Sequence, residues 1–172
     1  TALPSGSVTI GTAGATTPAR YSSGSISLTG SQVLTVNGPV ILTITGNLTV
    51  SSTAKILITS TGSLEVHLSG DLTLGGAGVE NLTQKPKNFI LIAKADNAYD
   101  SLAFSATTPL YGVIYTPNNS ITFSNSVTIF GSIVAKSITF NNLATIHYDK
   151  DLVNTVFSGI NTPYAVSNWR EV

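Results

Sequence analysis

Short stretches of this sequence recur at regular intervals along the chain, and this repetition limits the possible folds more than any other feature. The stretch Ile121–Ile129 returns as Ile138–Ile146, and both copies begin with Ile-Thr-Phe. Two further pairs match in the same way: Tyr111–Tyr115 with Phe130–Val134, and Leu42–Val50 with Val66–Leu74. Repeats of roughly 20 residues are typical of solenoid proteins, in which each repeat forms one turn that stacks on the next.

Apolar residues alternate with Thr, Ser and Asn within each repeat, and this period of two predicts β-strands. The runs between residues 25 and 150 are short and are broken by Gly or Asn, as at Gly46-Asn47. Thr and the β-branched aliphatic residues favour strands, whereas Gly and Asn tolerate tight corners. We therefore predict an all-β fold, a single-stranded parallel β-helix (β-solenoid) with two or three strands per coil and coils about 4.8 Å apart.

The repeat length also sets the number of coils. Residues 25–151 divided by the mean repeat give about six or seven coils. We favour right-handed winding, since the hexapeptide repeat of left-handed β-helices is not visible. Equivalent inward residues should stack, with Phe123 next to Phe140 and Ile129 next to Ile146. A Greek-key sandwich is the alternative, because it also has short alternating strands, but it does not predict sequence self-similarity.

Four segments depart from the repeat. We expect residues 1–24 to form an N-terminal extended or capping segment, residues 75–88 a loop excursion, and residues 94–110 partly a side loop. Residues 152–172 should form a C-terminal cap. An open last coil would expose the edges of its strands and invite pairing with another chain, which a cap prevents.

The charge pattern excludes several classes of function. Eight basic and eight acidic residues give a net charge of zero, and only 9% of the chain is charged. Binding to nucleic acid through bulk electrostatics is therefore disfavoured. Cysteine is absent, which excludes disulfides, thiol catalysis and thiolate metal sites. No stretch reaches the roughly 18 apolar residues of a membrane span.

The acidic residues give no sign of a catalytic pair. Adjacent coils do not present carboxylates at matched positions, since Asp71, for example, aligns with Asn47. His67 lies between Val66 and Leu68 and should face outward, with no second histidine near it in the sequence. We therefore predict no catalytic residues, no metal site and no cofactor.

Five residues are candidates for binding. His147, Tyr148 and Asp149 belong to the densest polar cluster of the chain, which could bind a cation or act as acid and base, or could serve as the junction between coil and tail. Tyr111 and Tyr115 should lie near coil corners. There they would either form an exposed aromatic face that stacks on sugars or fill the interior of the coils.

Three motifs together resemble a known bacterial module. The motifs are Tyr111-Gly112-Val113-Ile114-Tyr115-Thr116-Pro117-Asn118, Phe130-Gly131-Ser132-Ile133-Val134-Ala135-Lys136 and Ile146-His147-Tyr148-Asp149. The sequence is similar to a β-helical module of uncharacterised function that is found C-terminally in PilX-type proteins, which are associated with type IV pili, and in other surface-anchored proteins. The likeness spans residues 21–171 and carries no catalytic residues with it. It implies an extracellular, cell-surface or periplasmic location in a bacterium, with membrane attachment only through an N-terminal helix that is absent from this sequence.

Three functions follow as expectations. The first is a non-enzymatic structural or adhesion module of a pilus-associated or surface-anchored protein, with pilus proteins, other surface proteins or glycans as partners. The second is a carbohydrate-binding module or a polysaccharide lyase or hydrolase on a β-helix scaffold. The third is a cytoskeletal β-helix polymer, against which the polar tail after Asp149 argues.

Overall fold

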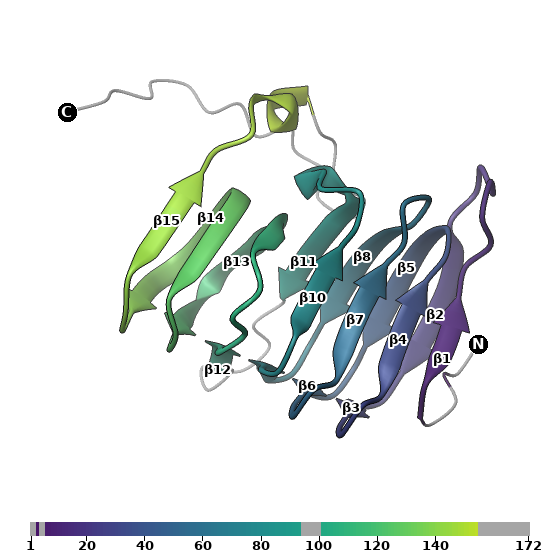
Figure 1. The fold of residues 1–172 in the computed structure, drawn as a ribbon, viewed down its shortest axis with the longest axis horizontal. Helices are drawn as coiled ribbons and strands as arrows, with labels where there is room; N and C mark the ends of the chain where they lie inside the picture. Colours follow the sequence, from purple (N-terminus) through teal and green to yellow (C-terminus); the bar gives the residue numbers. More distant parts are fainter. Residues whose placement is uncertain (1–2, 4–5, 94–100, 155–172) are drawn as a thin grey trace.

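The computed structural model describes residue 3, residues 6–93 and residues 101–154. This part of the chain is an all-β solenoid of about six turns in which every strand pair is parallel. The fold class predicted from the repeat is therefore confirmed. Figure 1 shows the coils stacked side by side along the long axis, from β1 at the N-terminal end to β15 at the other end.

Three rows of stacked strands form the walls of the solenoid (Figure 1). The first wall is a separate sheet of four strands: β1 (Val8–Ile10), β4 (Val33–Val36), β7 (Lys55–Ile58) and β10 (Gly78–Asn81). The second wall contains β2 (Ala19–Ser23), β5 (Pro39–Ile44), β8 (Ser63–Leu68) and β11 (Phe89–Ala93). The third wall contains β3 (Ile26–Leu28), β6 (Leu48–Val50), β9 (Leu72–Leu74) and β12 (Ser101–Phe104).

Two long strands join the second and third walls at the C-terminal end. These are β13 (Leu110–Phe123) and β14 (Val127–Phe140), and β15 (Ala144–His147) stacks on the start of β14. The predicted registers are confirmed: Leu42 pairs with Val66, Tyr111 with Phe130, and Ile121 with Ile138.

The first wall ends at β10, and this explains why the repeat shortens along the chain. Each coil up to β10 contains a strand of all three walls, so a full turn leads from Leu42 on β5 to Val66 on β8. The later coils lack the strand of the first wall. A full turn there leads from Leu110 to Ile129 and then from Ile121 to Ile138, over fewer residues.

The predicted loop at residues 75–88 is wrong in part, because it contains strand β10. Parallel pairing with β7 brings Gly78–Asn81 into the sheet although the segment has no clear alternation of apolar residues. Long-range backbone hydrogen bonds here outweigh a weak local preference for strand. The following 3-10 helix η1 (Pro86–Asn88) contacts β13 and β14, on the side where the first wall has ended.

The N-terminal boundary also differs from the expectation. Val8–Ile10 pairs with Leu34–Val36, and Ala19–Ser23 pairs with Val40–Ile44. Regular stacking therefore begins at Val8 rather than near residue 25, because the edge of the second coil offers backbone partners to a segment poor in apolar residues. Residue 101 begins strand β12, and residues 94–100 lie outside the described residues.

Inward-facing residues form one continuous aliphatic and aromatic core. Phe123 stacks between Phe104 and Phe140, at centroid distances of 4.8 Å and 5.0 Å. Ile129 pairs with Ile146, as predicted. Ile129 is fully buried but Ile146 is 50% exposed, because β15 belongs to the last described coil.

The chain leaves the last coil through a second 3-10 helix, η2 (Lys150–Asn154). Leu152 is buried in a small apolar cluster with Ile90, Ile92 and Val113, on the outer side of the second wall. The first residues of the predicted cap thus lie against a wall of the solenoid, and the rest of that segment, residues 155–172, lies outside the described residues. None of the helical segments that the structure describes has the length and hydrophobicity to span a membrane.

Candidate functional site

An aromatic stack runs across three coils on the outer surface at the C-terminal end. The rings of Tyr111 and Phe130 lie 4.5 Å apart with an interplanar angle of 6°. The rings of Phe130 and His147 lie 4.7 Å apart with an angle of 12°. Tyr111 and Phe130 are half-buried and His147 is exposed. We call these three residues the outer ring stack.

Strand alternation and the repeat together produce this stack. Leu110 and Ile129 point into the core, so the next residue on each strand, Tyr111 or Phe130, points outward. His147 follows Ile146 in the same way on β15. Parallel pairing of β13 with β14, and of β14 with β15, then places the three rings in register. Stacking of two such rings as Tyr111 and Phe130 contributes about 0.5–1.5 kcal/mol beyond area burial.

Two of the five predicted binding residues, Tyr111 and His147, are brought together by this stack, and the sequence-based selection missed its central member. Phe130 is not among the binding residues that the sequence predicts. The alignment of Tyr111–Tyr115 with Phe130–Val134 in the sequence is the pattern that identifies Phe130 as a member of the stack. Phe130 aligns with Tyr111 and lies one repeat before His147, so it belongs between these two candidates in the stack.

Tyr115 lies apart from the outer ring stack. It is further along β13 than Tyr111 and packs against the apolar cluster of Ile90, Ile92, Val113 and Leu152. It is half-buried there. Tyr115 therefore supports the attachment of η2 to the second wall and does not extend the aromatic surface.

Asp149 has a structural role in the turn that follows β15. Its carboxylate Oδ1 accepts a hydrogen bond from the backbone N–H of Asp151 at 2.9 Å, and its carbonyl oxygen accepts one from Leu152 at 3.1 Å. This is the arrangement of an Asx turn that starts a helical segment. Tyr148 is 49% exposed beside it. The junction interpretation thus fits Asp149, whereas His147 and Tyr148 remain accessible.

Two carboxylates pair with basic side chains. Glu80 Oε2 lies 2.7 Å from Lys55 Nζ on the first wall, and both side chains are partly exposed. Glu65 Oε1 lies 2.5 Å from His67 Nε2 on the outer side of β8, where the side chains are 13% and 19% exposed. His67 faces outward as predicted. Within the described part of the chain, no three His, Cys, Asp or Glu residues gather in a way that could hold a metal ion.

Asp71 belongs to a row of corner residues that connects successive coils. Ser25 Oγ accepts a hydrogen bond from the backbone N–H of Asn47 at 3.0 Å. Asn47 Oδ1 accepts one from the N–H of Asp71 at 3.0 Å, and Asp71 Oδ1 accepts one from the N–H of Ser101 at 2.7 Å. Each side chain thus satisfies a backbone donor of the next coil. This explains why Asp71 aligns with an Asn, since only an acceptor oxygen is needed at that position.

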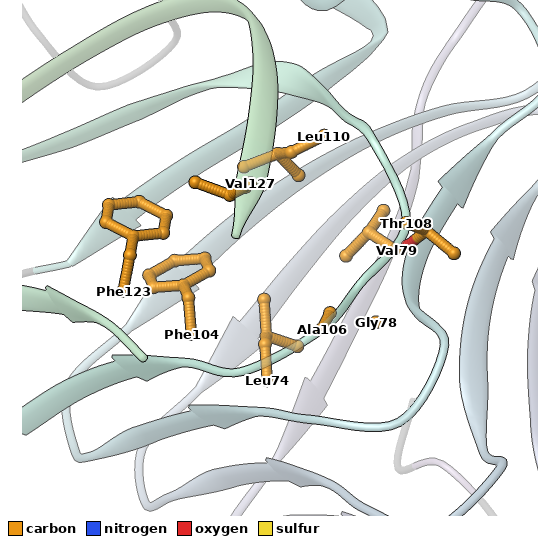
Figure 2. A pocket seen from close by; sticks show the side chains of 9 residues that line it. All are labelled: Leu74, Gly78, Val79, Phe104, Ala106, Thr108, Leu110, Phe123 and Val127. Carbon is orange, nitrogen blue, oxygen red and sulfur yellow. The ribbon is translucent and has the colours of Figure 1, made fainter. Parts of the chain in front are cut away.

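A small, partly open pocket lies where the first wall ends, and Figure 2 shows its lining. It has a volume of about 20 Å³ and is lined mainly by apolar residues such as Leu74, Val79, Phe104 and Leu110. This volume is close to that of a single water molecule and far below the roughly 300–1,000 Å³ of small-molecule sites. The pocket is therefore too small for a ligand.

Comparison with known proteins gives a family without an assigned activity. No curated protein and no solved structure matches this chain. Residues 5–155 match a family described as a domain of unknown function, DUF7305. The match begins just before β1 and ends just after η2, so it covers the whole described solenoid. The chain belongs to the DUF7305 family.

Proposed function

We propose that this chain is a rigid, non-enzymatic module of a bacterial surface protein, associated with type IV pili or held by another surface anchor. It acts outside the cytoplasm, at the cell surface or in the periplasm, in assembly or adhesion. The observation that carries this proposal is the uninterrupted parallel pairing from β2 to β15 along the second wall. The resemblance of the Tyr111, Phe130 and Ile146 motifs to the module of PilX-type proteins supports the pilus association.

The architecture suits a spacer that has to resist unfolding. Each inner coil shares backbone hydrogen bonds with both neighbours, and 29 buried hydrophobic residues of the described part of the chain form one core along the axis. Side-chain bonds at the corners, such as Asn47 to Asp71, add further links between coils. A module built in this way keeps its shape without disulfides, which this chain lacks.

The partners of the described carboxylates support a non-enzymatic role. Polysaccharide hydrolysis uses two carboxyl groups about 5–10 Å apart across a cleft. Here Glu80 pairs with Lys55, Glu65 contacts His67, Asp71 binds a backbone N–H, and Asp149 caps a turn. These contacts connect each of the four acids to its own coil or to a neighbouring one.

Replacement of the module in cells tests this proposal. Three strains are compared: one with the natural gene, one in which the segment encoding residues 5–155 is deleted in frame, and one in which an unrelated β-solenoid of equal length replaces it. We expect the deletion to reduce surface pili or cell adhesion, and the substitute solenoid to restore assembly but not specific adhesion. Normal pili and adhesion in the deletion strain would contradict the proposal, as would polysaccharide cleavage by the purified chain.

A second candidate function, glycan binding, is supported by the outer ring stack. Aromatic rings on a protein surface pack against the apolar faces of sugars, and His147 and Tyr148 are both exposed at the end of the stack. A screen of the purified chain against bacterial and host glycans tests this function, with His147→Ala and Phe130→Ala as variants. Binding that both variants weaken would support it, and a uniformly negative screen would exclude it.

A further inference from the structure

A shallow groove lies on the outer side of the second wall, and none of the three residues of the outer ring stack lines it. It has a volume of about 250 Å³. Its lining includes Pro39 and Ile41 of β5, Ser63 and Glu65 of β8, Lys87 of η1 and Ile90 of β11. The volume is near the lower limit of about 300 Å³ for small-molecule sites. The groove therefore has room for a small ligand or for one unit of a polymer.

Glu65 lines the groove between two isoleucines. It pairs directly across the sheet with Ile41 on one side and Ile90 on the other. Both isoleucines are only 8% exposed although they face outward. The contact between Glu65 Oε1 and His67 Nε2, at 2.5 Å, fixes the orientation of the carboxylate. The groove thus combines an apolar floor with one oriented acidic group.

Lys87 supplies a positive charge at the edge of the same groove. Its side chain is exposed, and no carboxylate among the described residues lies within ion-pair distance of its Nζ. The lysine is held on a short helix between two buried residues, Pro86 and Phe89. This anchoring keeps the backbone at Lys87 in place, so the ammonium group stays near the groove.

We propose that this groove binds an acidic sugar, a hexuronate unit of an extracellular polysaccharide. The carboxylate of the sugar pairs with Lys87, its hydroxyl groups bond to Glu65 and Ser63, and the apolar face of the ring packs on Pro39 and Ile41. A mixture of one cation, one carboxylate, one hydroxyl and an apolar floor matches a ligand that carries a single negative charge and many hydroxyl groups. The site is separate from the outer ring stack.

The topology argues against an extended peptide as the ligand. Peptides that bind sheets usually pair with the backbone of an edge strand. Strands β5, β8 and β11 each have a parallel neighbour on both sides, so their backbone groups are already used. A nucleic acid would need a cluster of cations, and among the described residues Lys87 is the only basic one that lines this groove.

Calorimetric titration with a trimer of galacturonate tests the proposal, with a neutral galactose trimer as the control ligand. We expect the intact chain to bind the acidic trimer and not the neutral one. Lys87→Gln should weaken binding at least tenfold, whereas Lys85→Gln should not change it, because Lys85 is also exposed but does not line the groove. Glu65→Gln should also weaken binding, and Glu80→Gln on the first wall should not.

The variants also separate this site from the outer ring stack. Phe130→Ala should leave binding of the acidic trimer unchanged. The proposal is overturned if the intact chain does not bind the acidic trimer at millimolar concentration, or if Lys87→Gln and Lys85→Gln bind equally well. A loss of binding in Phe130→Ala alone would place the sugar on the ring stack. Circular dichroism on every variant checks that the solenoid is folded.

Discussion

Asn47 and Asp71 occupy the same corner in successive coils, and the side-chain oxygen of Asn47 accepts a hydrogen bond from the backbone N–H of Asp71 at 3.0 Å. The two residues are one repeat apart. Their bond is one step of the row that runs from Ser25 to Ser101. Coil stacking in this protein thus depends on side-chain acceptors at a corner as well as on the strands.

Asn47→Ala tests the contribution of this corner. The substitution leaves the N–H of Asp71 without its acceptor, and loss of a comparable cap at a helix end costs about 0.5–2 kcal/mol. We expect the free energy of unfolding in urea to fall by about 1 kcal/mol. Asn118→Ala is the matched control, because Asn118 is exposed and no side-chain bond links it to another described residue. Equal stability of the two variants would show that the corner bond adds nothing.

The phenylalanine stack predicts a gradient of stability along the core. Phe123 is 1% exposed and stacks on both sides, whereas Phe140 is half-buried and stacks on one side in the described structure. Phe123→Ala should lower the free energy of unfolding by about 3–5 kcal/mol, the usual range for a buried phenylalanine. Phe140→Ala should cost clearly less. Denaturant unfolding measures both, and a larger loss for Phe140→Ala would mean that the last coil is more deeply buried than described.

The repeat could be predicted from the sequence because its signal is local and recurs. Ile121-Thr122-Phe123 and Ile138-Thr139-Phe140 are identical triplets with the right alternation, so fold class, register and the inner phenylalanine pair followed directly. Strand β10 could not be predicted in the same way. Gly78-Val79-Glu80-Asn81 has little strand preference, and its strand conformation comes from pairing with residues 55–58 of the preceding coil.

The two candidate sites also differ in whether they could be predicted from the sequence. The alignment of Tyr111 with Phe130 was present in the sequence, so the outer ring stack was within reach of sequence reasoning. The groove was not, because the register of β8 and β11 places Ile90 rather than Lys87 opposite Glu65, and Lys87 lies on a short helix outside the repeat. Glu65 and Lys87 come together only because η1 lies at the corner beside β8 and β11. Where such a helix lies depends on tertiary packing.

Leu152 tests whether η2 is held firmly against the second wall. It is 8% exposed and covers Ile92 and Val113 together with Tyr115. Leu152→Ala should lower the free energy of unfolding by about 2 kcal/mol, at the low end for a buried leucine, since the cluster is small. It should also speed cleavage by trypsin after Lys150. Leu82→Ala is the control, because Leu82 is 50% exposed. Unchanged cleavage in Leu152→Ala would contradict a firm attachment.

Gly112 gives a steric test of the interior at the point where the coils narrow. A Cβ atom at Gly112 would lie 2.5 Å from Cδ1 of Phe89, whose ring fills the space that the glycine leaves in the core. Because Phe89 is 1% exposed and tightly packed, the ring has little room to move. Overpacking of this kind costs about 1–3 kcal/mol, so Gly112→Ala should lower the free energy of unfolding by that amount.

A matched control and a rescue complete this test. Gly24→Ala places its Cβ in open space, with no heavy atom within 4 Å, and should leave the stability nearly unchanged. Phe89→Leu combined with Gly112→Ala should cost less than the sum of the two single changes, because the smaller leucine vacates the space that the new methyl group needs. Urea unfolding of the four variants measures the coupling. Strict additivity would mean that Phe89 and Gly112 do not share that space, and the packing described for this level of the solenoid would then be wrong.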